Sequence, residues 1–393
     1  MKRRAELDAA RGFMLVWMTL VHLPTTLTTW LNQPFGYISA SEGFIFLSAL
    51  LTGSIYFRIF ERDGLAAMNR KLLFRALRLY GCHALLLLFA FAAASRFALT
   101  GHPALHNMLD FFFAAGSERA VRDALLLLYR PPLLDIIPLY IGFCLLSPLV
   151  IVLGTRVSWR LVLGGSAALW VAAQFGLRAS LYRWTVASFP LRVPLNEMGA
   201  FNPWAWQLLW VFGVYFGVRW AKNELPAAKW AQRLWVPAAI AAVTLLFLRY
   251  AEVLGVVNLG NYSVLLDKWH LAPTRLIDFA AIVAVVLRFH PVLKQCGLRP
   301  FARPIARSLV MLGQASLRVF CAHFFFCFVA LGLVGSGASL AGWSQFAVAA
   351  ITLAALLLLA RISYKGRDLS SREKVPEPAW NYVQPQTTLK TPR

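Results

Sequence analysis

Ten apolar runs dominate the chain, and short polar segments separate them. A transmembrane helix needs roughly 17 to 25 mostly apolar residues, and the runs of that length lie at about 12–31, 36–57, 76–95, 133–153, 160–177, 204–221, 235–251, 274–290, 309–334 and 342–361. Of the 393 residues, 59% are hydrophobic and 14% are charged, which is typical of a polytopic membrane protein. The pattern predicts an all-α integral membrane bundle of about ten transmembrane helices.

The distribution of positive charge predicts the orientation of this bundle. The formal net charge is +22, and a value of that size would also suit a nucleic-acid-binding protein. With a cytoplasmic N-terminus, however, 27 of the 39 Lys and Arg residues fall in inside segments and 10 fall in outside segments. This asymmetry follows the positive-inside rule. We therefore expect both termini in the cytoplasm and no nucleic acid as a partner.

The segments outside the runs predict little additional structure. Residues 1–363 form one transmembrane domain, whereas 364–393 have no apolar period and are expected to be a disordered cytoplasmic tail. The longest other segment, 96–132, is expected outside the cytoplasm with one or two interfacial helices. The basic start at Lys2 to Arg4 resembles a signal peptide, but Asp8, Arg11 and His22 interrupt the apolar part, so we expect an uncleaved first helix. The five cysteines lack paired spacing, so neither a disulfide framework nor a zinc site is expected.

Ionisable residues in the first apolar run are the most informative feature of the sequence. Eleven residues at about 100° each bring His22 to within about 20° of the direction of Arg11, with a rise of about 16 Å. The two side chains therefore share one helix face at two depths. Asp8 lies one turn before Arg11, where it would lower the cost of a guanidinium near the membrane. Because imidazole accepts and returns protons near neutral pH, this face is a candidate reaction site.

Simpler interpretations of these residues stay open. Arg11 would serve equally as an anchor at the cytoplasmic interface, and His22 as a hydrogen-bonding group between helices. Glu42 begins the second run near the expected level of His22, and we expect it to orient the imidazole, as the carboxylate does in a Ser-His-Asp triad. The alternative for Glu42 is a helix-start charge that the macrodipole favours.

A basic pair opens the third apolar run. Arg75 and Arg78 are one turn apart at the expected cytoplasmic surface, and two guanidinium groups match the geometry of phosphates. The alternative is ordinary positive-inside anchoring. The sequence has no glycine-rich phosphate loop, metal-binding motif or Gly-x-Ser-x-Gly elbow, so a reaction would use groups within the bundle.

Several segments together resemble the OpgC family, a branch of the integral-membrane acyltransferase (acyltransferase-3-like) superfamily. The superfamily signature on the first helix is similar to Leu7-Asp8-Ala9-Ala10-Arg11-Gly12, with ten residues between the Arg and His22. The OpgC-like segments follow in family order, from about residue 7 to 326, and they are Ser41–Ser48, Leu134–Tyr140, Phe201–Leu208 and Leu312–His323. One departure is Ala49 after Ser48, where the family usually has Gly.

This resemblance implies a membrane O-acyltransferase in the bacterial inner (cytoplasmic) membrane. The donor would be cytoplasmic acyl-CoA, with succinyl-CoA or acetyl-CoA expected and no tightly bound cofactor. The acceptor would be a hydroxyl of a periplasmic or cell-envelope glycan, with osmoregulated periplasmic glucan as the leading candidate. Acyl-CoA, the glycan, membrane lipids and the glucan-synthesis machinery are thus the expected partners.

The resemblance also assigns roles to individual residues. In the superfamily the first-helix Arg and His are essential, so these roles carry over to Arg11 and His22. Basic residues at the start of the third helix suit the CoA phosphates, which favours Arg75 and Arg78. The remaining candidates would bind or line the acceptor, with buried polar pairing between helices as the alternative; they are Asp135, Tyr140, Asn202, Trp206, Gln207 and His323.

Two other classes of function remain compatible with the sequence. A glycan or lipid transporter, or a flippase, would also need a basic polytopic bundle with a polar outer mouth, but it would perform no acyl transfer. A structural or sensor subunit of a glucan-synthesis complex would not need His22. Binding or hydrolysis of acyl-CoA by the purified protein separates the acyltransferase from a pure transporter.

Overall fold

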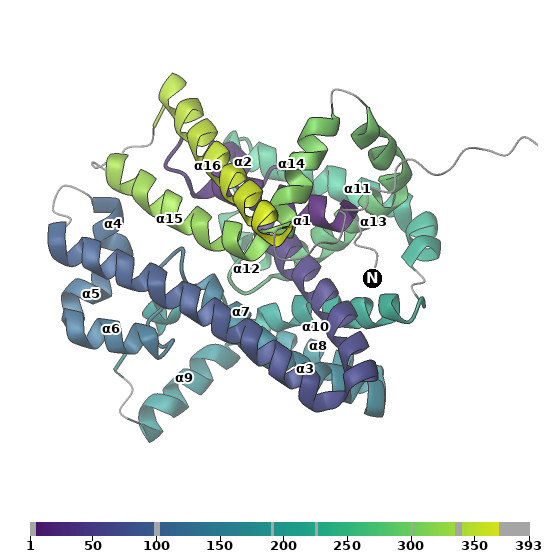
Figure 1. Cartoon of the computed structure of the whole chain (residues 1–393), viewed down its shortest axis with the longest axis horizontal. Helices are drawn as coiled ribbons and strands as arrows, with labels where there is room; N and C mark the ends of the chain where they lie inside the picture. Colours follow the sequence, from purple (N-terminus) through teal and green to yellow (C-terminus); the bar gives the residue numbers. More distant parts are fainter. Residues whose placement is uncertain are drawn as a thin grey trace, which may run out of the picture.

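The computed structural model describes residues 5–97, 103–189, 192–224, 227–299, 302–334 and 340–368 (Figure 1). Helices account for the regular structure of these ranges, apart from one isolated bridge between Thr25 and Leu340. The helices are α1 (Ala5–His22), α2 (Thr28–Leu31), α3 (Ala40–Phe97), α4 (Pro103–Met108), α5 (Asp110–Ala115), α6 (Ser117–Leu125), α7 (Ile136–Leu153), α8 (Trp159–Gln174), α9 (Leu177–Ser188), α10 (Pro203–Ala221), α11 (Ala227–Val253), α12 (Ser263–Leu266), α13 (Pro273–Leu298), α14 (Arg303–Gln314), α15 (Ser316–Val334) and α16 (Trp343–Asp368).

The predicted all-α membrane class agrees with this architecture. Within the described ranges, six helical stretches are long and apolar enough to cross a membrane: Ala40–Arg96, Ile136–Gln174, Arg233–Val253, Pro273–Leu293, Ser316–Leu333 and Trp343–Ser363. The first two stretches each contain two of the predicted spans. The number ten and the orientation of the bundle stay predictions.

The second and third predicted spans are the two arms of α3. Instead of the expected loop between 57 and 76, the helix continues and breaks at Gly64, whose backbone has φ 82° and ψ 177°. Good helix formers fill this segment, and glycine adopts a positive φ without steric cost. Arg75 Nη1 donates to Thr52 Oγ1 at 2.8 Å. Because these two residues are about equally far from Gly64, the arms fold back beside each other at that level.

Other helix ends follow local chemistry. The first span was expected over 12–31, but α1 ends at His22, two residues before Pro24. A proline in the next turn removes a backbone donor and prevents continuation of the helix. α7 passes through a π-helical turn, Gly154–Ser158, before α8 begins after the extended backbone of Ser158. The tail expected from 364 begins within α16, and its part after Asp368 lies outside the described residues.

Glycines allow two pairs of helices to pack with their backbones in contact. A Cβ atom at Gly12 of α1 would lie 1.9 Å from the Leu309 carbonyl oxygen of α14, and one at Gly313 would lie 1.8 Å from that of Asp8. Between α3 and α10, a Cβ at Gly217 would lie 2.1 Å from the Leu50 carbonyl oxygen. Small residues permit such close approach in membrane bundles, where packing drives helix association.

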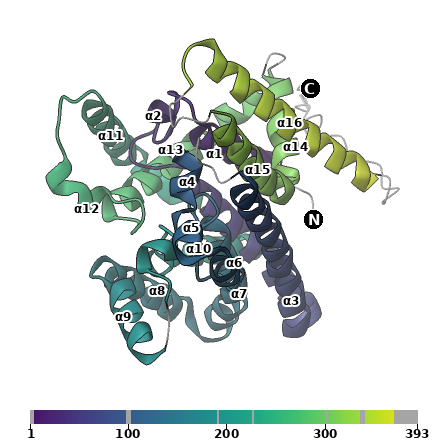
Figure 2. The same cartoon turned by 90° about the vertical axis from the view of Figure 1, so that its left-hand side faces the viewer.

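The α1 helix is central to the bundle. It packs against α3, α14 and α15, and the two views place it among these helices (Figures 1 and 2). Backbone hydrogen bonds join the segment after α1 to Leu340 just before α16: Thr26 N to Leu340 O at 3.1 Å and Leu340 N to Pro24 O at 2.8 Å. The end of α1 is thus held on several sides.

The α1–α14 contact predicts a difference between two glycines. Gly313→Ala should destabilise the purified protein, because its Cβ would overlap the Asp8 carbonyl, and overpacking costs about 1–3 kcal/mol. Gly164→Ala is the matched control, since Gly164 is exposed within α8 and a Cβ there meets no atom within 4 Å. Thermal unfolding in detergent should show a lower Tm for Gly313→Ala and an unchanged or higher one for Gly164→Ala. Equal Tm values for Gly313→Ala and the wild type would contradict the contact.

The predicted orientation is testable by labelling from the two sides of the membrane. Ser117 and Glu224 are exposed and belong to segments that we expect on opposite sides. In a background without the five native cysteines, Ser117→Cys should react with an impermeant maleimide added from outside, and Glu224→Cys should react only after the membrane is opened. Labelling of both from one side would overturn the predicted topology.

Candidate active site

His22 lies directly beside His323, 301 residues later in the chain. His22 is the last residue of α1, and His323 is a fully buried residue of α15. His22 Nδ1 and His323 Nε2 are 3.4 Å apart, and the ring planes differ by 16°. Phe324 packs on His323 with ring centroids 3.9 Å apart. This arrangement brings together one predicted catalytic residue and one predicted acceptor-binding residue, and we call them the histidine pair.

A backbone carbonyl assigns the tautomers of the histidine pair. His323 Nδ1 lies 2.5 Å from the carbonyl oxygen of Phe320. Since a carbonyl oxygen accepts hydrogen bonds only, Nδ1 carries the proton and the neutral ring has its lone pair on Nε2. His22 Nδ1 then donates to His323 Nε2. The lone pair of His22 is consequently on Nε2, the nitrogen directed away from the histidine pair.

Glu42 has a different partner from the one that we expected. Its carboxylate forms a fully buried ion pair with Arg275 of α13; Arg275 Nε donates to Oε1 at 2.8 Å, and Nη2 donates to the same oxygen. The other oxygen accepts from the backbone N and the Oγ of Ser39, at 3.0 and 2.6 Å. These contacts occupy the carboxylate, and the ring nitrogen that lies beside His22 belongs to His323.

Asp278 extends this buried ionic region one turn further along α13. Its Oδ2 accepts from the backbone N of Tyr37 at 2.6 Å and of Ile38 at 3.3 Å. The loop between α2 and α3 is thereby fixed to α13. Removing one partner of a buried ion pair costs about 3–5 kcal/mol, so the contact between Glu42 and Arg275 couples α3 to α13 strongly.

Lys268 lies in the loop before α13, and its charge acts on His22 of the histidine pair. Its ammonium group is within Coulombic range of His22, Glu42 and Asp135, and it stacks over the Trp269 ring at 5.1 Å. Burial lowers the pKa of Lys268, while the charges of Glu42 and Asp135 oppose part of that shift. Among the described residues, no carboxylate lies within ion-pair distance of this ammonium. The positive charge near His22 is therefore only partly compensated.

Arg11 and Arg75 belong to a second group of polar side chains, which is separate from the histidine pair. The charges of both guanidinium groups act on the Tyr140 hydroxyl. This hydroxyl donates to the Phe44 carbonyl at 3.1 Å. Asp8 and Arg11 are half-buried, and each makes contacts within the protein. α1 thus presents Arg11 to one interior group and His22 to another, as the shared helix face predicted.

The two arginines of α3 do not form one surface pair. Arg75 turns inward to Thr52, whereas Arg78 is exposed. Since the same helix carries both, the difference follows from their faces: Arg75 points to the other arm of α3. The expected phosphate-matching pair is accordingly divided between an interior position and a surface position.

Four predicted acceptor residues bond to the protein itself. Asp135 Oδ2 accepts from the Ala200 backbone N at 2.9 Å, and Asn202 caps α10 by accepting from Trp204 N at 3.1 Å. The other bonds run from Trp206 Nε1 to the Trp269 carbonyl at 3.1 Å, from Gln207 Nε2 to the Ser166 carbonyl at 2.8 Å, and from Ser166 Oγ to Gln207 Oε1 at 2.7 Å. Of these contacts, the one between Gln207 and Ser166 is a polar pair between two helices, and the others join loop backbone or cap α10.

Three functional candidates were missed from the sequence. Arg275 and Asp278 begin the predicted span 274–290, and the rule that singled out Arg11 and His22 would have found them as ionisable residues in an apolar run. Lys268 carries no comparable signal, because a lysine in a polar loop is ordinary. No group of three or more metal-ligating side chains occurs within the described ranges.

Comparison with known proteins agrees with the residues that suggested a resemblance. The chain matches the family model described as "OpgC protein" over residues 3–367, which is most of its length. No curated protein and no solved structure matches it significantly. The matched range contains α1, the histidine pair and the ion pair of Glu42 with Arg275. The chain therefore belongs to the OpgC family.

Proposed function

We propose that this protein is an acyltransferase that moves an acyl group from cytoplasmic acyl-CoA to a hydroxyl of a cell-envelope glycan. The observation that carries the proposal is the histidine pair, in which a buried, hydrogen-bonded ring leaves His22 Nε2 available as a base. Membership of the OpgC family supports the same class of reaction. Succinyl or acetyl groups and an osmoregulated periplasmic glucan are the donor group and acceptor that the resemblance favours.

The chemistry requires one base and a stabilised oxyanion. His22 Nε2 removes the proton of the sugar hydroxyl while the oxygen attacks the thioester carbonyl carbon. The carbonyl oxygen becomes negatively charged, and the partly compensated ammonium of Lys268, whose charge acts on His22, would stabilise it. When the C–S bond breaks, imidazolium returns the proton to the CoA thiolate. An acyl-His22 intermediate is the alternative route through the same nitrogen.

The polar group of Arg11, Arg75 and Tyr140 suits the binding of the acyl-CoA donor. Arg11 is about 16 Å from His22 along α1, a separation that fits recognition of the extended CoA molecule rather than of its reacting carbonyl. Arg75 adds a second guanidinium beside Tyr140. Guanidinium groups bind phosphate with two parallel hydrogen bonds. The donor would thus enter from the side of Arg11 and Arg75 and present its thioester to His22.

The residues of α10 support the acceptor side through the loop that carries Lys268. Asn202 N donates to the Trp269 carbonyl at 3.0 Å, and Trp206 Nε1 donates to the same oxygen. Trp170 of α8 holds Leu271 in the same way, at 2.9 Å. These bonds fix the position of the loop that carries Lys268, so we assign them a positioning role for the site.

Donor binding should distinguish the two arginines of α3. Arg75→Gln should weaken acyl-CoA binding about tenfold or more, because a charge-assisted contact to phosphate is worth about 1.5–3 kcal/mol. Exposed Arg78→Gln should have a smaller effect that high salt removes. Titration of purified variants with acyl-CoA measures both, with exposed Arg70→Gln as the matched control. Equal affinities of Arg75→Gln and Arg70→Gln for acyl-CoA would show that Arg75 has a purely structural role.

The histidine pair should control catalysis without controlling insertion. His22→Gln should lower kcat by about 10²–10⁴-fold, because glutamine keeps hydrogen bonding but is no base. His323→Ala should lower kcat because His22 Nδ1 loses its acceptor, and His323→Gln should recover part of the rate by supplying a carbonyl oxygen. The measurement is acyl transfer to isolated glycan by reconstituted protein, with KM for acyl-CoA determined alongside.

Exposed His290→Gln is the control for these variants and should retain wild-type kcat. A wild-type rate in folded His22→Gln would exclude His22 as the base. A transporter would move glycan or lipid in every variant and would neither bind nor cleave acyl-CoA. Equal rates for His323→Ala and His323→Gln, both reduced, would contradict the role of the hydrogen-bond acceptor.

A further inference from the structure

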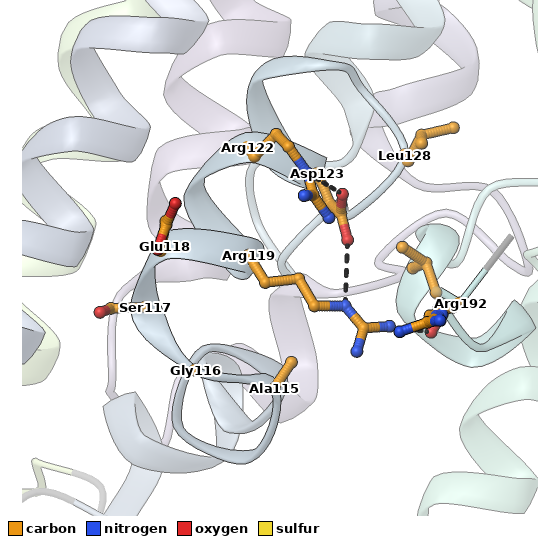
Figure 3. A pocket seen from close by; sticks show the side chains of 10 residues that line it. Ala115, Gly116, Ser117, Glu118, Arg119, Arg122, Asp123, Leu128 and Arg192 are labelled. Atoms are coloured by element: carbon orange, nitrogen blue, oxygen red, sulfur yellow. Dashed lines mark hydrogen bonds and ion pairs between the residues drawn. The ribbon is translucent and has the colours of Figure 1, made fainter. Parts of the chain in front are cut away.

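A cavity of about 770 Å³ lies between the start of α6 and the segment that follows α9 (Figure 3). It shares no lining residue with the histidine pair or with the ion pair of Glu42 and Arg275. Three arginines line it, Arg119 and Arg122 from α6 and Arg192 from the later segment. Both segments belong to loops that we expect outside the cytoplasm.

One buried carboxylate holds two of these arginines in place. Arg119 Nε is 3.6 Å from Asp123 Oδ2, and Arg122 Nε is 3.2 Å from Asp123 Oδ1. Arg192 brings a third guanidinium. Three guanidinium groups against the Asp123 carboxylate leave two positive charges on this wall of the cavity. Glu118 also lines the cavity, but Figure 3 shows its side chain directed away from the arginines.

The arginines are held close together despite their like charges. Arg119 Nη2 donates to the backbone carbonyl of Arg192 at 2.9 Å, which places the two residues side by side. The adjacent carbonyl of Val193 accepts from the Tyr182 hydroxyl of α9 at 3.1 Å. Arg119 and the backbone at Arg192 are therefore held in place without a ligand, and preorganisation of this kind lowers the entropic cost of binding.

The positive end of α6 faces the same cavity. Gly116, Ser117 and Glu118 line it, and they are the N-cap and first turn of this nine-residue helix. No side chain among the described residues caps the helix at Gly116, whose φ is 86°. The first N–H groups of a helix lack intrahelical partners and carry the positive end of the helix dipole. They add to the attraction of the arginines for an anion.

We propose that this cavity binds a compact oxyanion, a phosphate or carboxylate group carried by a larger ligand. Arginine pairs bind both groups with parallel hydrogen bonds. The volume lies within the range of about 300–1,000 Å³ typical of small-molecule sites, so the ligand has a body attached to its anionic group. Two sources share this chemistry: the head group of an anionic phospholipid and an acidic saccharide. The site goes beyond acyl transfer and does not depend on it.

The test is titration of the full-length protein in a nonionic detergent with inorganic phosphate at constant ionic strength. The double variant Arg122→Gln/Arg192→Gln should bind phosphate at least about tenfold more weakly than the wild type, since two charge-assisted contacts are lost. Arg119 is left intact because it also holds the backbone at Arg192. Arg183→Gln, a matched change at an exposed arginine of α9, should bind as the wild type does.

Absence of saturable phosphate binding by the wild type would overturn the proposal, and so would equal affinities of the double variant and Arg183→Gln. The same titration in nanodiscs identifies the source. If phosphatidylglycerol weakens phosphate binding relative to pure phosphatidylcholine, and does so in the wild type but not in the double variant, the ligand is a lipid head group. If both bilayers give the detergent affinity, the anionic group belongs to a soluble ligand, such as an acidic saccharide, and not to a lipid.

Discussion

The contact between the backbones of α1 and α14 determines where the candidate catalytic residues of α1 lie. Asp8, Arg11 and His22 belong to α1, so their positions follow from how deeply that helix enters the bundle. Gly12 and Gly313 let the two backbones touch, and any side chain at either position would push the helices apart. In lipid, where apolar contact with a neighbour gains little over contact with acyl chains, this shape complementarity fixes the helix. Gly12 and Gly313 thus contribute by setting the distance between α1 and α14, and not by any chemical group of their own.

Buried charge imposes the second constraint on the bundle. Glu42 and Arg275 have no exposed surface, and each alone would be very costly in a low-dielectric environment. Their mutual contact ties the start of α3 to the start of α13, and Asp278 ties the preceding loop to the same helix. Buried ion pairs rarely add stability relative to apolar residues, but they disfavour arrangements in which the partners separate. This network therefore restricts the register of the helices around the histidine pair.

Much of the architecture followed from patterns in the sequence, and the exceptions have physical reasons. The apolar runs predicted the all-α membrane class, whereas α1 ends at His22, earlier than its apolar run, because Pro24 lies in the next turn. The loop expected between the second and third runs is helical, because a chain of helix formers needs only one glycine, Gly64, to reverse direction. Hydrophobic periodicity describes which residues are buried, but it carries no information on how a break between two long helices is made.

The candidate site was predictable only in part. Helical geometry placed Arg11 and His22 on one face from their spacing alone. The partner of His22 could not be found in this way, because His323 is 301 residues away and no local pattern links them. Glu42 was the expected partner because it begins the second run near the expected level of His22, whereas packing pairs it with Arg275. Contacts of this kind depend on tertiary structure, and only the ordered family motifs indicated that α15 belongs to the same site.

The hydrogen bond from His323 to the Phe320 carbonyl also decides how a proton moves. A proton taken up by His22 can be shared with His323 through the contact between the two rings, but the carbonyl beyond His323 has no capacity to receive it. The two rings can therefore exchange a proton with another molecule only through His22 Nε2. In the proposed reaction the same nitrogen would therefore take the proton of the hydroxyl and return it to the leaving thiolate, so that uptake from one substrate would depend on release to the other.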